Sequence, residues 1–153
     1  YASAVGEVNV VAKMKAVDAV FGGEGNGGVI YPDLHYGRDA LVGIALFLSH
    51  LAVNNETVSG LRKRYPNYVI SKQKVALTQH LDPDEVIQKL AELHKDKKQD
   101  HQDGLKILME KEWVHLRKSN TEPIIRLYAE AGSSEEAERI AREAMQTIET
   151  LMN

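Results

Sequence analysis

The sequence has 153 residues, of which 43% are hydrophobic and 27% are charged, and its formal net charge at pH 7 is -3. These values are typical of a globular chain with room for one medium domain or two small ones, and the net negative charge argues against a nucleic-acid-binding protein. There is no cysteine, which excludes disulfides and thiolate metal sites and favours a reducing compartment such as the cytoplasm.

The first 66 residues read as part of an α/β domain. Residues Gly6 to Val17 suit a short helix, and Ala16 to Phe21 suit a strand. Five glycines fall within residues 22–28, and a short apolar strand, Val29 to Tyr31, follows them. We therefore predict two strands joined by a glycine loop.

A long apolar segment follows, from Ala40 to Val53, with Asp39 placed to cap it as a helix. Its apolar residues lie on every side, which predicts a buried helix, and it is shorter than the roughly 20 residues that a bilayer requires. A second short helix is expected from Glu56 to Lys63. The cluster Tyr65-Pro66-Asn67 then marks a domain boundary.

The remainder, residues 67–153, reads as strand, helix, three strands and helix. Asp82-Pro83-Asp84-Glu85 has the cap, the first-turn proline and the acidic residues of a helix start. The polar tract His94 to Gly104 is predicted to be an exposed connection. The three strands are expected at Leu105 to Met109, Trp113 to Lys118 and Ile124 to Ala131.

Period-2 alternation in the last of these strands places its apolar residues on one face and Arg126 and Tyr128 on the other. Ser133 with Glu136 three residues later is a capping-box pattern for the final helix. This half is therefore predicted to be an α+β domain, in which two helices pack on one face of an antiparallel sheet.

The most informative segment is Ser119-Asn120-Thr121-Glu122-Pro123, which has Arg117 before it and Arg126 after it. Two guanidinium groups, two hydroxyls and the backbone N–H groups of a tight turn suit a phosphate monoester, which is nearly dianionic at neutral pH. Glu122 would repel phosphate, so we expect it to orient a neighbouring arginine. The residue types alone fit equally a polar hairpin turn with two unrelated surface arginines.

The string from Arg117 to Arg126 closely resembles the phosphate-binding loop of the α-D-phosphohexomutases, the family of phosphoglucomutases, phosphomannomutases and phosphoglucosamine mutases. The resemblance implies that the substrate phosphate is bound by five residues of this chain: Arg117, Ser119, Asn120, Thr121 and Arg126. It also implies that residues 1–66 belong to the third, sugar-binding domain of that family and residues 67–153 to the fourth.

The glycine loop gains meaning from the same resemblance. Alone, it could be a flexible hairpin turn. The phosphohexomutases carry a sugar-binding loop of the form Gly-Glu-x-Ser-Gly-His, and the segment 23–28 keeps its glutamate as Glu24. It has Asn26 where serine is usual and Gly28 where histidine is usual. We expect Glu24 and Asn26 to bind sugar hydroxyls. Ser3-Ala4-Val5-Gly6-Glu7 also resembles, loosely, the family segment Thr-x-Val-Gly-Asp.

Two family loops are missing from the sequence: the phosphoserine loop Thr-Ala-Ser-His-Asn-Pro and the Mg²⁺-binding loop Asp-x-Asp-x-Asp. Asp82-x-Asp84 is explained by helix capping. The resemblance therefore implies an isomerase of the phosphotransferase type whose Mg²⁺ and catalytic residues lie in N-terminal domains outside this chain. We expect the chain alone to bind no metal and to have no mutase activity.

Several alternatives remain open on the sequence. The chain could be a non-catalytic module that binds phosphorylated hexoses, or, with less support, an α+β domain that binds RNA on its sheet. The sequence does not separate glucose, mannose and glucosamine phosphates. If residues 1–66 are only part of a domain, they leave apolar surface uncovered, which would favour pairing with another copy of the chain.

Overall fold

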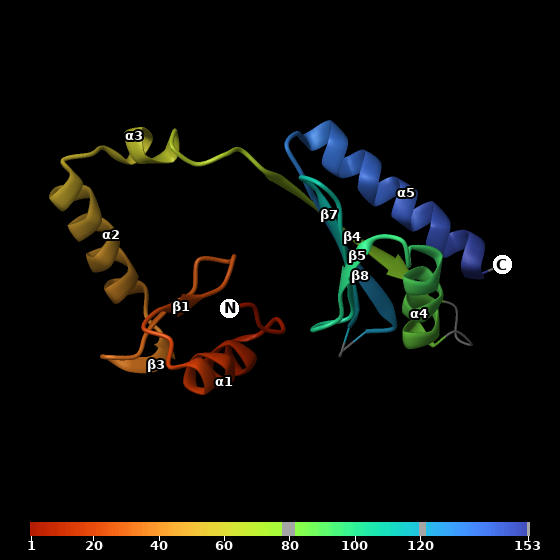
Figure 1. Ribbon diagram of the computed structural model, residues 1–153, viewed down its shortest axis with the longest axis horizontal. Helices are drawn as coiled ribbons and strands as arrows, with labels where there is room; N and C mark the ends of the chain where they lie inside the picture. Colours follow the sequence, from red (N-terminus) through yellow and green to blue (C-terminus); the bar gives the residue numbers. More distant parts are fainter. Residues whose placement is uncertain (78–81, 120–121, 153) are drawn as a thin grey trace. The chain divides into compact units, whose positions relative to one another are not determined.

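A computed structural model describes residues 1–77, 82–119 and 122–152 (Figure 1). The chain divides into two compact units, Tyr1–Pro66 and Asn67–Asn153. Among the residues described, no helix combines the length and the apolar character needed to span a bilayer.

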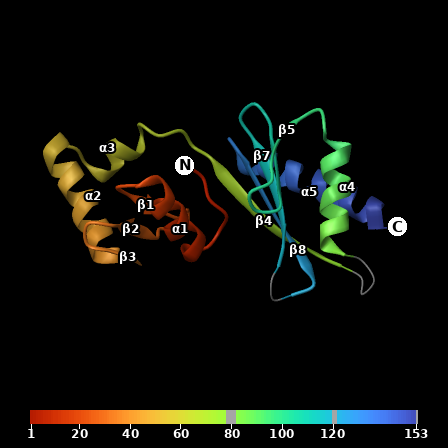
Figure 2. The ribbon, with the colours of Figure 1, turned by 60° about the horizontal axis from the view of Figure 1, so that its bottom comes forward.

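The first unit is built from three short antiparallel strands in the order β1-β2-β3 and from helices that precede and follow them (Figure 2). Its small core consists of Val10, Met14 and Ile30. The elements are α1 (Glu7–Val17), β1 (Gly22–Gly23), β2 (Val29–Tyr31), β3 (His35–Arg38), α2 (Ala40–Asn54) and α3 (Val58–Arg62).

The strand predicted at 16–21 is wrong. Helix α1 continues to Val17, and Asp18 ends it in the left-handed conformation with φ 52°. Strand β1 instead consists of Gly22 and Gly23, and a Cβ at Gly22 would lie 2.2 Å from the Met14 sulfur. The glycine thus lets the core methionine of α1 pack closely against this strand.

Helix α2 is confirmed, but its predicted burial is wrong. The Asp39 carboxylate accepts a hydrogen bond from the Val42 N–H at 3.0 Å, as an N-cap residue should. Among the residues of α2, however, only Leu51 is buried, and Leu41 is 79% exposed. An all-round apolar helix needs a layer on each side, and the described residues of this unit supply too little surface to cover it.

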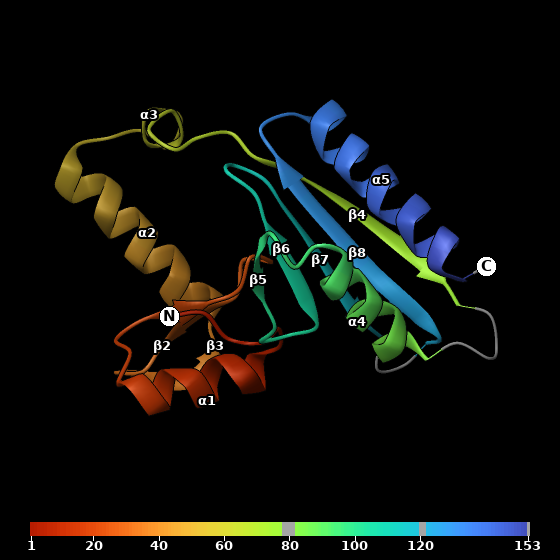
Figure 3. The ribbon, with the colours of Figure 1, turned by 45° about the vertical axis from the view of Figure 1, so that its right-hand side comes forward.

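The second unit is a five-stranded antiparallel sheet in the order β4-β8-β7-β6-β5. Helices α4 and α5 cover the same face of this sheet (Figure 3). The prediction of an α+β domain after an α/β segment is thus confirmed. The elements are β4 (Val69–Ala76), α4 (Pro83–Leu93), β5 (Lys98–Asp100), β6 (Leu105–Leu108), β7 (Trp113–Lys118), β8 (Ile124–Ala131) and α5 (Ser134–Met152).

The core of this unit lies between the sheet and its two helices. Leu127 and Ile125 of β8 are fully buried against Val86 and Leu90 of α4 and a row of residues from α5, namely Ala137, Ile140, Ala141 and Ile148. The predicted cap of the last helix is confirmed, since Ser133 Oγ accepts a hydrogen bond from the Glu136 N–H at 3.2 Å.

The tract His94 to Gly104 is not only an exposed connection, because it contains the edge strand β5 (Lys98–Asp100). It pairs with β6 in the antiparallel direction, and Gln99 lies opposite Ile107. The Gln99 side-chain amide donates to the carbonyl groups of Ala91 and His94 at the end of α4, both at 2.8 Å. A polar segment can therefore form a strand when a neighbouring edge supplies its backbone partners.

Candidate functional site

The glycine loop connects β1 and β2 as a tight turn. Glu24 N–H donates to Gly28 O, and Gly27 N–H donates to Glu24 O, each at 3.0 Å. Gly27 has φ 93°, a conformation that favours glycine. Asn26 Oδ1 accepts from the Gly28 N–H at 3.0 Å, so its carbonyl group helps to shape the loop. The amide NH₂ of Asn26 is the part of this side chain that remains available to a ligand.

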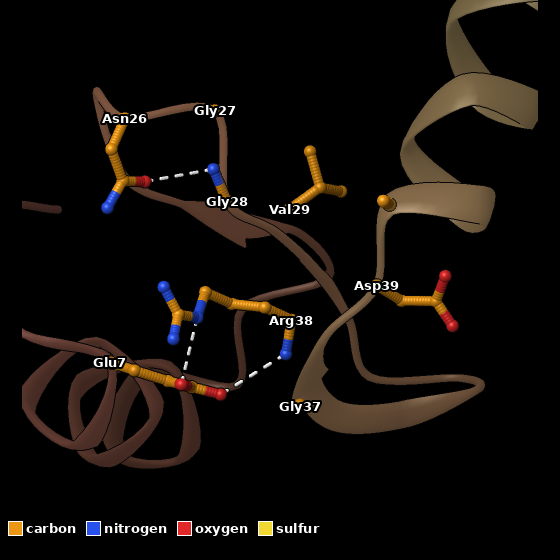
Figure 4. A pocket seen from close by; sticks show the side chains of 9 residues that line it. Glu7, Asn26, Gly27, Gly28, Val29, Gly37, Arg38 and Asp39 are labelled. Carbon is orange, nitrogen blue, oxygen red and sulfur yellow. Dashed lines mark hydrogen bonds and ion pairs between the residues drawn. The ribbon is translucent and has the colours of Figure 1, made fainter.

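A hollow of about 640 Å³ opens beside this loop (Figure 4). Its lining includes Asn26, Gly28, Arg38 and Asp39, together with Glu7 from the start of α1. Polar donors and acceptors of both kinds are the groups that recognise neighbouring hydroxyls of a sugar ring.

Arg38 links Glu7 at the start of α1 to Glu24 in the glycine loop. Its Nε donates to Glu7 Oε2 at 2.9 Å, and its backbone N–H donates to Glu7 Oε1 at 3.2 Å (Figure 4). Its Nη1 lies 3.9 Å from Glu24 Oε2. The side chain also occupies the space over Gly28, where an added Cβ would lie 2.8 Å from Arg38 Cδ. Arg38 thus fills the space that a side chain at position 28 would need.

The structure therefore brings Asn26 into the hollow and leaves Glu24 next to it, linked through Arg38. Sequence reasoning missed Arg38, and no motif could have identified it, because its partner Glu7 lies 31 positions earlier in the chain. The loose similarity of residues 3–7 to a family segment was the only signal, and it concerned Glu7 alone.

In the second unit, Arg117 and Arg126 lie directly opposite each other on β7 and β8. Both belong to the sheet face that the helices leave open, because Leu116 and Leu127 beside them point into the core. Like charges directly opposite each other destabilise a sheet. The pair is therefore a feature that packing alone does not explain.

The arginines have only partial compensation. Arg126 Nη2 lies 3.3 Å from Glu122 Oε2, so Glu122 pairs with a neighbouring arginine as expected. Arg117 Nε lies 4.0 Å from Asp103 Oδ2, which is too long for a hydrogen bond. Within the described part of the chain, this buried Nε has no hydrogen-bond partner. A buried donor left unpaired costs free energy that an anionic ligand would recover.

Asp103 reaches Arg117 because of Gly104, which follows it with φ 77°. A Cβ at Gly104 would lie 2.3 Å from the Leu116 carbonyl oxygen. Only glycine lets this turn lie flat against β7. The Asp103 carbonyl oxygen also contacts His115 Nε2. Asp103 therefore contacts both Arg117 and His115, which lie two residues apart on the open face of β7.

Of the other predicted phosphate ligands, Ser119 continues from β7, and its backbone N–H donates to Ile124 O at 3.0 Å. Asn120 and Thr121 lie outside the described residues. Lys118 points to the helix side of the sheet, where its ammonium group contacts the Asp84 carboxylate. That hydrogen bond raises the pKa of Lys118 above its ordinary value. Lys118 therefore lies on the opposite face of the sheet from the two arginines.

Comparison with known families assigns both units. Residues 1–68 match the model described as phosphoglucomutase/phosphomannomutase, alpha/beta/alpha domain III, and residues 73–147 match the model for the C-terminal domain of the same family. The chain belongs to the phosphoglucomutase/phosphomannomutase family. Its two units correspond to two consecutive domains of that family, which is the phosphohexomutase family indicated by the loop around Ser119.

The chain is similar to several members of this family. It is 37% identical to a phosphoglucosamine/phosphogalactosamine mutase of Sulfurisphaera tokodaii over 95% of this chain and 32% of that protein. It is 38% identical to a phosphoglucomutase/phosphomannomutase of Thermococcus kodakarensis over 87% of this chain and 29% of that protein. The chain thus spans about a third of the length of these relatives.

A solved structure agrees with this assignment. The crystal structure of a phosphoglucomutase/phosphomannomutase family protein from Burkholderia thailandensis matches 97% of this chain and 32% of its own, with a TM-score of 0.71 and 28% identity. Both the fold and the family of this chain are thereby established.

Proposed function

We propose that this chain supplies the sugar- and phosphate-binding part of an enzyme that interconverts hexose 1-phosphate and hexose 6-phosphate. The observation that carries the proposal is the opposed pair Arg117 and Arg126, with the unpaired Arg117 Nε, beside a loop of family sequence. In this proposal the non-reacting phosphate is held by Arg117, Ser119, Asn120, Thr121 and Arg126.

The glycine loop has a complementary role in the proposal. Glu24 and Asn26 bind ring hydroxyls, while the arginine pair binds the phosphate that does not react. Binding energy from that remote phosphate then positions the reacting hydroxyl, and it contributes to rate only when it is realised in the transition state. Glu24 and Asn26 belong to the unit Tyr1–Pro66, and the arginines belong to the unit Asn67–Asn153.

In this proposal the reacting groups belong to another part of the whole protein, as the resemblance of the sequence implies. Over residues 1–77, 82–119 and 122–152, no group of three or more His, Asp or Glu side chains is arranged to hold a metal ion. Asp82 and Asp84 have other contacts: Asp82 caps α4 by accepting from the Asp84 N–H at 2.9 Å, and Asp84 contacts Lys118. We place Mg²⁺ and the phosphoserine in N-terminal domains, with which this chain would pair.

The phosphate claim is tested by titrating the chain with glucose 6-phosphate and with glucose. We expect the chain to bind glucose 6-phosphate and not glucose. We also expect Arg117→Ala to lower the affinity about tenfold or more, because a charged hydrogen-bond partner is removed. Arg139→Ala is the matched control, since Arg139 pairs with Glu136 and Glu143 on α5. Equal responses to both sugars would defeat the proposal.

A coupled mutase assay tests whether the chain needs the rest of the protein for activity. We expect no turnover by the chain alone, and turnover by a longer protein that carries the phosphoserine and Mg²⁺ loops. If the longer protein lacked both loops, the alternative of a non-catalytic module that binds sugar phosphates would be favoured.

A further inference from the structure

A third cation lies in line with the two arginines. Lys74 of the edge strand β4 is directly opposite Arg126 of β8, which is itself directly opposite Arg117 of β7. Directly opposite residues on one face have Cβ atoms about 4.5–5.5 Å apart, so the three side chains form one row across three neighbouring strands. We call Lys74, Arg126 and Arg117 the cationic row.

The cationic row has fewer negative partners than positive charges. Arg126 is paired with Glu122 at 3.3 Å, and Arg117 has Asp103 at 4.0 Å. No carboxylate of the described residues lies within ion-pair distance of Lys74, whose side chain is exposed. A row of like charges destabilises a sheet, so an uncompensated third cation indicates that an anion completes it.

The row also lies beside the phosphate loop. Leu77 N–H donates to Pro123 O at 3.2 Å, which ties the end of β4 to the end of the loop. Ala76, which precedes Leu77, is opposite Ile124, and Lys74 lies two residues before Ala76 on the same face of the strand. The ammonium group of a lysine at this position can reach an anion held between Arg117 and Arg126.

We propose that Lys74 is a further phosphate-binding residue, which supplies the third positive charge for a dianionic phosphate monoester. The inference rests on the proposed function, because it assumes that Arg117 and Arg126 hold that phosphate. A phosphate monoester carries a charge of about -1.5 to -2 at pH 7 and has three acceptor oxygens, which match three separate donors. Lysine contributes as a point charge, while each arginine can donate a fork.

A simpler role for Lys74 makes a different prediction. Lysines on an edge strand prevent pairing with another chain, whatever their register. Lys72 is also on β4, is exposed and faces the same side, but it lies opposite Tyr128, with its Nζ 5.8 Å from the ring centroid. Edge protection therefore assigns Lys72 and Lys74 the same role, whereas the cationic row distinguishes them.

The experiment compares Lys74→Gln, Lys74→Arg and Lys72→Gln in the 153-residue chain, with NMR titration of glucose 6-phosphate as the measurement. We expect Lys74→Gln to weaken binding about tenfold, Lys74→Arg to retain it within about twofold, and Lys72→Gln to change it by less than about twofold. The thermal midpoint of Lys74→Gln should equal or exceed that of the unaltered chain, because a like-charge contact is removed.

The outcomes separate the two proposals. If Lys74→Gln binds as well as the unaltered chain while Arg117→Ala does not, the inference about Lys74 is overturned and the proposed function stands. Equal losses in Lys74→Gln and Lys72→Gln would also overturn it, because they would reflect general surface charge. If Arg117→Ala retains full binding, the proposed function itself fails.

Discussion

Arg38 is the residue whose surroundings change the interpretation of the glycine loop. A family loop with histidine at its end has Gly28 here, and the sequence alone suggests that a contact is missing. The structure instead places the Arg38 side chain in that space, with Glu7 at 2.9 Å and Glu24 at 3.9 Å. The glycine therefore leaves room for the Arg38 side chain.

This relation predicts coupling between Gly28 and Arg38. Gly28→Ala should lower the free energy of unfolding by about 1–3 kcal/mol, since its Cβ would displace Arg38 from Glu7. In Gly28→Ala with Arg38→Ala, most of that loss should disappear. Thermal unfolding of the four proteins of the cycle measures the coupling, and additive effects within about 0.5 kcal/mol would contradict it.

At the scale of elements, the most reliable predictions from sequence were helix starts. Asp39, Ser133 and Asp82 each cap a helix, as expected. A cap depends on residues only two or three positions away, so local sequence contains its cause. The strand expected at 16–21 failed because α1 continues to Val17 and ends at Asp18, whose backbone N–H donates to the Met14 carbonyl oxygen.

The cap of α2 predicts a pH dependence of stability. The hydrogen bond from the Val42 N–H lowers the pKa of Asp39 below its ordinary value. A carboxyl whose pKa is lower in the folded state contributes stability that is present above the unfolded pKa, about 3.9, and is lost as pH falls through the folded value.

Unfolding midpoints of the unaltered chain and Asp39→Ala, compared between pH 7 and pH 3, test this expectation. The difference should be full at pH 7 and should shrink below about pH 4, as the carboxylate is protonated. Asp39→Asn is the matched control, because its amide oxygen can accept the same hydrogen bond without titrating. A constant difference across this range would show that the charge of Asp39 is irrelevant.

At the scale of the whole molecule, the two units differ in how completely they bury apolar surface. The sheet and helices of Asn67–Asn153 enclose a continuous core, whereas helix α2 of Tyr1–Pro66 exposes Ile44, Leu48 and Val53. Uncovered apolar surface is expected of a partial domain, and the self-association that it would favour remains a prediction.

We predict that residues 67–153 alone unfold in one cooperative transition. Their core is internal to this segment, so removal of residues 1–66 should leave it intact. In that segment Leu127→Ala should lower the free energy of unfolding by about 2–5 kcal/mol, since Leu127 is fully buried. Denaturant unfolding followed by circular dichroism is the measurement, and a gradual transition in the unaltered segment would disprove internal closure.

The sequence by itself determined the class of each half, the helix caps and the loop around Ser119, because each rests on neighbouring residues or on a short continuous motif. Only the tertiary structure decided the contact of Glu7 with Arg38 and the exposure of α2. It also decided the row that Lys74 forms with Arg126 and Arg117, since strand register joins residues far apart in the chain. Register depends on which faces are buried, and that is settled only when the core closes.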